Sequence, residues 1–181
     1  MRNIKIHMLI AILTCFCFSC KDDDNPRGGS FVLDEKQYAL SRALTEPYPG
    51  DGDYHTWYLS LSSKGLKFDE SIGYYSGKGE LVIAWLYSYG FNRDELPEGV
   101  YVWPTVSSKS FVSNLEVVVG YESPGEHDEY FSVFSEAFFI VERKDKGNYE
   151  IEFSLTTSGT NKKITGAYTG PVEITEIALP Y

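Results

Sequence analysis

The hydrophobic positions of the chain alternate with polar positions through most of its length after residue 30. The clearest case is Tyr149–Leu155, in which every second residue is apolar or aromatic and the residues between are Glu or Ser. Tyr54–Ser62 has the same period, with Trp57, Leu59 and Leu61 on one face. A period of two is typical of a strand with one buried face. The pattern therefore predicts β-strands separated by short turns.

Further strands are predicted by composition and by flanking turn residues. Phe31–Leu33 and Lys36–Leu44 flank Asp34-Glu35 and indicate a hairpin. Glu80–Tyr89 is apolar at nearly every position, as expected of a central strand covered on both faces. Two more predicted strands are Val100–Trp103 and Phe111–Tyr121, the latter with Leu115, Val117, Val119 and Tyr121 in phase. The last is Lys163–Ile177, with Ile164, Tyr168, Val172 and Ile174 facing inward and Gly166 and Gly170 marking a bulge or tight bend.

One segment, Tyr130–Glu142, has the length of a helix. Its content of Phe and Val favours a long or bulged strand instead, because aromatic and β-branched side chains fit a pleated surface better than a helix. The rest of the sequence offers no convincing helix. We therefore expect an all-β chain.

The predicted fold is a single antiparallel β-sandwich formed by residues 31–181. A closed or partly open, lipocalin-like β-barrel is the alternative. Both architectures bury one face of each strand and join the strands by short turns, so alternation alone does not separate them.

The first residues have the anatomy of a signal peptide. Arg2 and Lys5 provide a positive start, Met8–Phe18 is a run of low polarity, and Ser19 is a small residue at the expected cleavage position. The apolar run is shorter than the roughly 20 residues that a helix needs to span a bilayer. Residues 1–19 are therefore predicted to be a lipoprotein signal peptide rather than a transmembrane anchor.

Cys20 is the predicted site of lipid attachment. Cys15 and Cys17 are weaker candidates, because the residues before them, Thr14 and Phe16, suit a lipoprotein peptidase less well than Ser19 does. Residues 20–30 are then a lipidated acidic tether. Several acyl chains on Cys20 would hold the protein stably on a membrane, whereas one chain binds only marginally.

The acidic run Lys21, Asp22, Asp23 and Asp24 directly follows this cysteine. Four later segments accompany it: Phe31-Val32-Leu33-Asp34-Glu35-Lys36-Gln37-Tyr38-Ala39-Leu40, Leu96-Pro97-Glu98-Gly99-Val100-Tyr101, Gly147-Asn148-Tyr149-Glu150-Ile151-Glu152-Phe153 and Ile164-Thr165-Gly166-Ala167-Tyr168-Thr169-Gly170. In this combination the chain resembles small surface lipoproteins of Bacteroidetes-type bacteria with a single all-β domain. The resemblance implies anchoring in the outer membrane, with the acidic run as an export signal that makes the protein face outward. It supplies no catalytic residues. Apart from this resemblance, the acidic run is explained as a solvated tether, because like charges repel and extend the chain.

Composition narrows the classes of partner. The chain has 26 acidic and 16 basic residues and a net charge of −10, which argues against nucleic acid and against anionic membrane surfaces as partners. No cysteine follows Cys20, so the domain has neither disulfides nor thiol chemistry. Aromatic residues make up 15 % of the chain, including 14 Tyr, and supply large areas for burial.

The sequence contains little recognisable catalytic chemistry. Behind the leader the histidines are His55 and His127, and neither has a recognisable nucleophile or orienting partner in the sequence. There is no Gly-x-Ser-x-Gly motif and no phosphate-binding glycine loop. We expect no enzymatic activity and no cofactor. A glycan hydrolase that uses two carboxylates is the least favoured alternative.

Calcium is a weak hypothesis. Asp51 and Asp53 flank Gly52 in one loop, and Glu126, Asp128 and Glu129 adjoin His127 in a second. Hard cations favour such oxygen ligands, but neither loop has the spacing of an EF-hand, so solvated loops are favoured and no metal is predicted.

Aromatic residues beside turns are the remaining candidates for binding. They are Tyr74, Tyr75, Tyr101 and Trp103. Exposed rings stack on sugars or anchor protein interfaces, although such residues more often plug the ends of a core. The sequence thus predicts a non-enzymatic surface lipoprotein that binds a glycan or an envelope protein. A structural or assembly component of the cell envelope is the alternative.

Overall fold

The computed structural model of the chain describes residues 28–48, 54–90, 92–104, 110–122, 126–145 and 147–175. These residues form strands and turns and contain no helix. The strands are β1 (Gly28–Leu33), β2 (Lys36–Leu40), β3 (Arg42–Tyr48), β4 (Tyr54–Ser62), β5 (Leu66–Asp69), β6 (Tyr74–Gly77), β7 (Gly79–Tyr89), β8 (Gly99–Trp103), β9 (Ser110–Tyr121), β10 (Glu129–Phe131), β11 (Phe134–Arg143), β12 (Asn148–Thr157) and β13 (Lys163–Ile174). The all-β prediction is confirmed.

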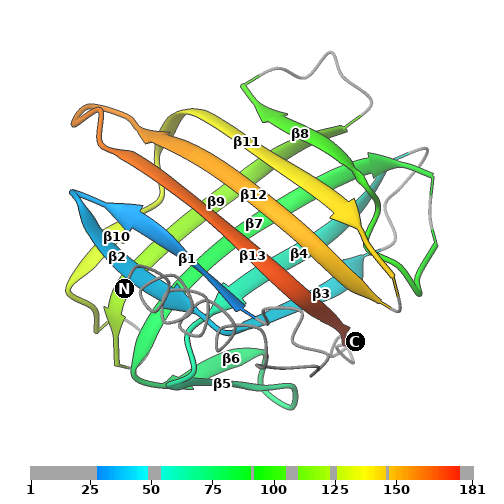
Figure 1. Cartoon of the computed structure of the whole chain (residues 1–181), viewed down its shortest axis with the longest axis horizontal. Helices are drawn as coiled ribbons and strands as arrows, with labels where there is room; N and C mark the ends of the chain where they lie inside the picture. Colours follow the sequence, from blue (N-terminus) through cyan, green and yellow to red (C-terminus); the bar gives the residue numbers. More distant parts are fainter. Residues whose placement is uncertain are drawn as a thin grey trace, which may run out of the picture.

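Eight of these strands close into a barrel in the order β3-β4-β7-β9-β8-β11-β12-β13 and back to β3. In Figure 1, β11, β12 and β13 cross in front of β3, β4, β7 and β9. The preference for a sandwich was wrong, and the barrel alternative is correct. The physical reason is that β12 pairs with both β11 and β13, and β13 continues onto β3, so the sheet has no break between two layers. The β8–β9 and β13–β3 pairs are parallel, which departs from the up-and-down order of a lipocalin.

Strand β13 makes this closure possible by changing neighbours along its length. Residues 164–169 pair with β1, and Val172–Ile174 pair with β3. Of the predicted bulge or tight bend, the bulge is absent, because β13 keeps a continuous register with β12. Gly166 instead allows close packing: a Cβ there would lie 2.4 Å from Cζ of Phe153 and 2.7 Å from Cβ of Phe31. Gly170 adopts a φ of 150°, which side chains disfavour.

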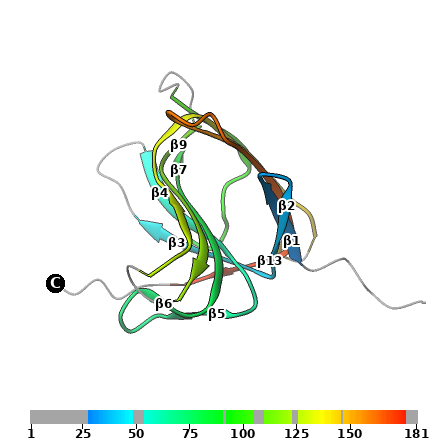
Figure 2. The same cartoon turned by 90° about the vertical axis from the view of Figure 1, so that its left-hand side faces the viewer.

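The β1–β2 hairpin is confirmed, and it extends the sheet beyond β13. Its turn residues, Asp34 and Glu35, have φ angles of 49° and 66°, as in a two-residue type I′ turn. The predicted second strand ends earlier than expected, because Ser41 separates β2 from β3. Figure 2 shows this hairpin on one side of the barrel and β3, β4, β7 and β9 on the other.

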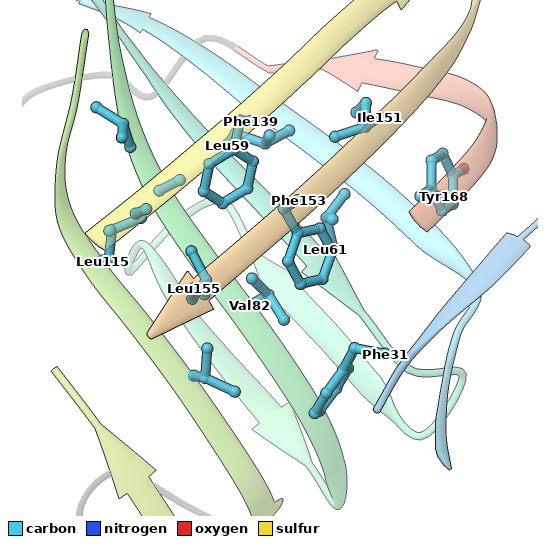
Figure 3. Packing of buried hydrophobic residues seen from close by; sticks show 14 of the residues in the cluster. Phe31, Leu59, Leu61, Val82, Leu115, Phe139, Ile151, Phe153, Leu155 and Tyr168 are labelled. Atoms are coloured by element: carbon cyan, nitrogen blue, oxygen red, sulfur yellow. The ribbon is translucent and has the colours of Figure 1, made fainter. Parts of the chain in front are cut away.

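The inside of the barrel is filled with apolar side chains (Figure 3). Trp57, Leu59 and Leu61 point inward as their alternation predicted, and they meet Ile151 and Phe153 from β12 in one core. Because the interior is filled by side chains, a ligand would bind at the outer face of the barrel.

The segment with the length of a helix is extended, as its composition favoured. Its first part forms the short strand β10, which pairs with β9, and its second part forms β11. The register of β11 shifts between Phe134 and Glu136, which agrees with the bulged strand that its composition favours.

A second, smaller cluster lies on the outer face of the barrel. The β5–β6 hairpin forms a separate two-stranded sheet, and it places Leu66 and Tyr75 against Leu81, Ile83 and Val118 of the barrel. Strand β7 is therefore covered on both faces, as predicted. The prediction for Tyr121 was wrong. The preceding Gly120 has a φ of 65°, and this local turn directs Tyr121 to the outer cluster instead of the core.

Candidate functional site

A cavity of about 500 Å³ opens beside this outer cluster, and we name it the outer groove. Its floor comes from outward positions of β4, β7 and β9, and its walls come from the β5–β6 hairpin and from His127 and strand β10. It is lined by Tyr58, Gly73, Tyr74, Tyr75, Leu81, Ile83, Trp85, Glu116, Val118, Tyr121, His127 and Tyr130. A volume of this size is in the range of small-ligand sites.

Strand register brings the floor residues together. Tyr58 lies opposite Trp85, and Ile83 lies opposite Glu116, so all four side chains project from the same face of three adjacent strands. Trp85 packs edge-on against Tyr58, with ring centroids 5.7 Å apart. It also stacks on Tyr48 at 5.4 Å. The indole is thus held in one orientation by two neighbours.

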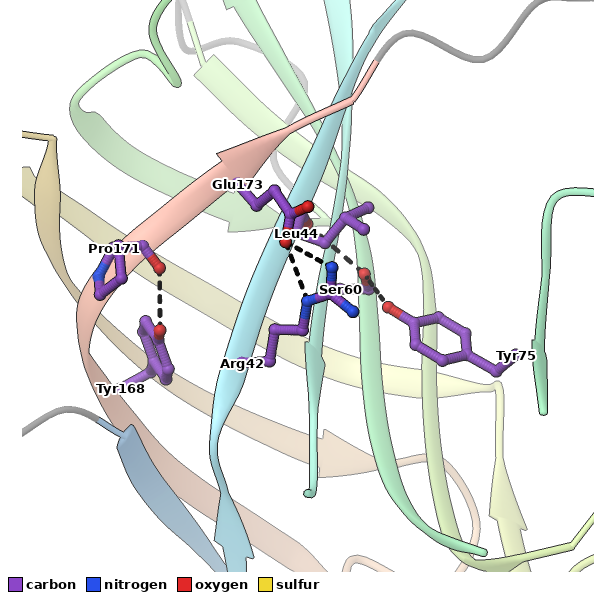
Figure 4. A network of polar contacts seen from close by, with 7 residues as sticks. All are labelled: Arg42, Leu44, Ser60, Tyr75, Tyr168, Pro171 and Glu173. Atoms are coloured by element: carbon purple, nitrogen blue, oxygen red, sulfur yellow. Dashed lines mark hydrogen bonds and ion pairs between the residues drawn. The ribbon is translucent and has the colours of Figure 1, made fainter. Parts of the chain in front are cut away.

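The walls are fixed by hydrogen bonds. The Tyr75 hydroxyl shares a hydrogen bond of 2.6 Å with Ser60 Oγ, and Ser60 Oγ donates to the Leu44 carbonyl at 3.4 Å (Figure 4). The Tyr121 hydroxyl donates to the Tyr75 carbonyl at 2.8 Å. These contacts hold the β5–β6 hairpin over β4 and β9. On the other wall, His127 stacks on Tyr130 with centroids 5.3 Å apart.

The polar groups of the groove suit a ligand rich in hydroxyls. Burial raises the pKa of Tyr58, and nearby groups including Glu116 raise it further. Burial and the charge of Glu116 also raise the pKa of Tyr130. Both phenols are protonated at neutral pH and can donate hydrogen bonds, and the Tyr130 hydroxyl is within hydrogen-bonding reach of Glu116. Glu116 provides carboxylate oxygens that can accept them.

Aromatic side chains continue along the same strands beyond the groove. The ring of Tyr87 stacks on Phe111 at 4.4 Å, and Tyr54 packs edge-on against Phe111 and Tyr89, both at 5.7 Å. We name Tyr54, Tyr87, Tyr89 and Phe111 the aromatic strip. It provides further exposed ring surface on the same outer face.

A buried carboxyl group lies next to the groove. Glu46 is opposite Tyr58 in the β3–β4 pair and is only 2 % exposed. The Tyr48 hydroxyl donates to its Oε2 at 2.7 Å, whereas Oε1 has no hydrogen-bond partner among the described residues. Burial raises the pKa of Glu46; the hydrogen bond from Tyr48 lowers it in part, and the charge of Glu70 raises it again.

The four aromatic residues predicted from the sequence do not form one platform. Tyr74 is 62 % exposed at the rim of the outer groove, and Tyr75 lies in its wall with its hydroxyl buried. Trp103 is half-exposed at a separate cavity of about 200 Å³ and donates to the Phe134 carbonyl. Tyr101 is a core residue whose hydroxyl donates to the Pro97 carbonyl at 2.7 Å. Since its ring is fully buried, Tyr101 does not present a face to a ligand in this structure.

The remaining predicted residues are dispersed or lie elsewhere. His55 is on β4, and His127 is in the outer groove. Within the described part of the chain, no three His, Cys, Asp or Glu residues are grouped so that they could hold a metal ion. In the second acidic loop, Glu129 pairs with Lys162 at 3.2 Å. The lipidation site Cys20, the export signal Lys21, Asp22, Asp23 and Asp24, and the calcium candidates Asp51 and Asp53 lie outside the described residues.

Sequence reasoning missed most residues of the groove. Tyr58, Trp85, Glu116, Tyr121 and Tyr130 lie far apart in the chain, and only strand pairing brings them together. One signal was present: aromatic residues occupy outward positions of β4 and β7, where polar residues are expected on a solvated face. Large aromatic side chains at such positions indicate a binding surface or a covering element.

None of the described segments forms a helix long and apolar enough to span a membrane. A scan against models of protein families, a search of curated proteins and a search of solved structures each give no match to this chain. The chemistry of the outer groove is accordingly the basis for assigning a function.

Proposed function

We propose that this protein is a non-enzymatic lipoprotein of the outer membrane that faces outward and binds a glycan in the outer groove. The observation that carries the proposal is the combination of Trp85, Tyr58 and Tyr130 with the single carboxylate of Glu116 around a cavity of about 500 Å³. Aromatic rings offer flat apolar faces at little cost in conformational entropy. Sugar rings have apolar faces of matching shape and hydroxyl groups around their edges.

The polar groups complement such a ligand. Protonated phenols donate to sugar oxygens, and Glu116 accepts hydrogen bonds from sugar hydroxyls. The aromatic strip supports binding of a chain rather than a single sugar, because Tyr54 and Tyr89 extend the exposed rings beyond the groove. Location supports the proposal as well: the leader, Cys20 and the acidic run predict a domain held at the cell surface, where glycans are abundant.

The alternatives make different predictions. A structural or assembly component of the envelope would have a stable stoichiometric protein partner and no glycan ligand. A glycan hydrolase of the two-carboxylate type needs a pair of acids about 5–10 Å apart. Among the described residues that line the groove, Glu116 is the only carboxylate, which favours binding over hydrolysis.

The test is a glycan array probed with the detergent-solubilised full-length protein, with a pull-down from envelope extracts in parallel. Tyr130 is 44 % exposed, so Tyr130→Ala should fold while weakening glycan binding about tenfold, the equivalent of about 1.4 kcal/mol. Phe138→Ala is the matched control, because Phe138 is 40 % exposed on β11, outside the groove.

Binding of a glycan by the wild type and the Phe138→Ala variant, with loss in Tyr130→Ala, supports the proposal. A stoichiometric protein partner without any glycan signal would favour the structural alternative. Equal binding by both variants would remove the groove from consideration.

A further inference from the structure

The charges around the outer groove are mostly negative. Glu116 lines it, and among its described lining residues there is no Lys or Arg. The buried Glu46 lies opposite Tyr58 in the β3–β4 pair, outside this lining. An anionic group that enters the groove therefore faces the carboxylate of Glu116 and meets no Lys or Arg among the described lining residues.

Two cations near the walls, Arg42 and Lys78, have carboxylate partners. Arg42 influences the pKa of Tyr75, and its guanidinium forms an ion pair with Glu173 of β13 (Figure 4). Lys78, in the turn between β6 and β7, forms an ion pair with Glu122. Because each positive charge is matched by a neighbouring carboxylate, neither offsets the charge of Glu116 inside the groove.

We propose that the outer groove selects glycans with uncharged sugar units and discriminates against acidic sugars such as uronates and sulfated sugars. This inference rests on the proposed glycan-binding function and specifies its ligand class. Uncharged hydroxyls donate to Glu116, so the carboxylate keeps hydrogen bonds when water leaves the groove. An anionic sugar loses water and gains a like charge at short range, in surroundings less polar than water.

The experiment compares matched ligands on full-length, detergent-solubilised protein. Glucan, mannan and galactan oligosaccharides are each presented beside their uronic-acid counterparts, so that only the C6 carboxylate differs. We expect the wild type to prefer the neutral member of a pair at least about tenfold. The preference should shrink as salt is raised from about 0.01 to 0.15 M, because the screening length falls from about 30 to 8 Å.

The decisive variant is Glu116→Gln, which removes the charge with little change of shape. It should raise affinity for the uronate member about tenfold and change affinity for the neutral member less. Glu152→Gln is the control, since Glu152 is an exposed residue of β12, outside the groove lining, and it should alter neither affinity.

The possible outcomes distinguish a failure of charge selection from a failure of the proposed glycan-binding function. If the wild type binds uronates as tightly as neutral glycans while Tyr130→Ala still weakens binding about tenfold, glycan binding stands and charge selection is wrong. The same conclusion follows if Glu116→Gln leaves the preference unchanged. If no oligosaccharide of either kind binds, both the function and the inference are overturned.

Discussion

The carboxyl group of Glu46 shows how one side chain can depend on its tertiary neighbours. Its position between Thr45 and Pro47 on β3 carries no sequence signal, yet strand pairing places it beside Tyr58 and under the outer face. Among the described residues, only one of its oxygens receives a hydrogen bond, from Tyr48. Burial favours the neutral form, so the pKa lies above the ordinary value of 4.5.

This pKa predicts a pH-dependent effect of Glu46→Gln. Because the folded state binds the proton more tightly than the unfolded state, the contribution of Glu46 to stability is greatest below pH 4.5 and is lost as the pH rises through the raised pKa. The variant should therefore melt at a higher temperature than the wild type at pH 7, by about 2–4 °C for each kcal/mol. The difference should vanish near pH 4 in thermal unfolding followed by circular dichroism.

Glu152→Gln provides the reference, because its exposed side chain has little effect at either pH. A lower melting temperature for Glu46→Gln at pH 7 would mean that the ionised carboxylate stabilises the fold.

At the level of elements, the β5–β6 hairpin depends on the barrel for its position. A lone two-stranded hairpin is marginal in water. This hairpin is a separate sheet, so it is held by the apolar contacts of Leu66 and Tyr75 and by the hydrogen bond between Tyr75 and Ser60. Since the hairpin forms a wall of the outer groove, the stability of this contact also sets how well the groove is formed.

A double-mutant cycle on Tyr75→Phe and Ser60→Ala measures that contact. The side chains are buried, so each single change should cost about 1–2 kcal/mol, and the coupling between them should be about 1 kcal/mol. Urea unfolding of the four proteins gives these values. Tyr74→Phe, next to Tyr75 and exposed, should be neutral. A coupling below about 0.3 kcal/mol would indicate that packing alone holds the hairpin.

Strand prediction succeeded where the information is local. β4, β7 and β12 were recognised because alternation, or an unbroken apolar run, reports how many faces of a strand are buried. It failed at Tyr121, where the left-handed Gly120 changes the phase, and at Ser41, where one predicted strand is two. Such interruptions are set by where the neighbouring strands lie, and the pattern of one segment does not contain that information.

At the scale of the whole molecule, the predicted lipid anchor decides where the protein acts, and mutations can test it. Cys20→Ala should abolish acylation and release the protein from membranes, as measured by labelled-lipid incorporation and membrane fractionation. Replacing Asp22, Asp23 and Asp24 by Ala should keep the lipid but reduce digestion by external protease if the run is an export signal. Label retained on the Cys20→Ala variant would assign the lipid to another residue, and unchanged protease digestion would leave the acidic run a tether.

The sequence by itself determined the all-β class and most strands, because these depend on the alternation of apolar and polar residues within each segment. Only the tertiary structure decided that the sheet closes, since β13 pairs not only with the neighbouring β12 but also with β1 and β3, which are distant in sequence. It also assembled the outer groove, because Tyr58, Trp85, Glu116 and Tyr130 become neighbours only through strand register. A sandwich and a barrel have the same alternation of apolar and polar residues within each strand and differ in which distant strands pair. The residues of the outer groove are brought together by that same long-range pairing.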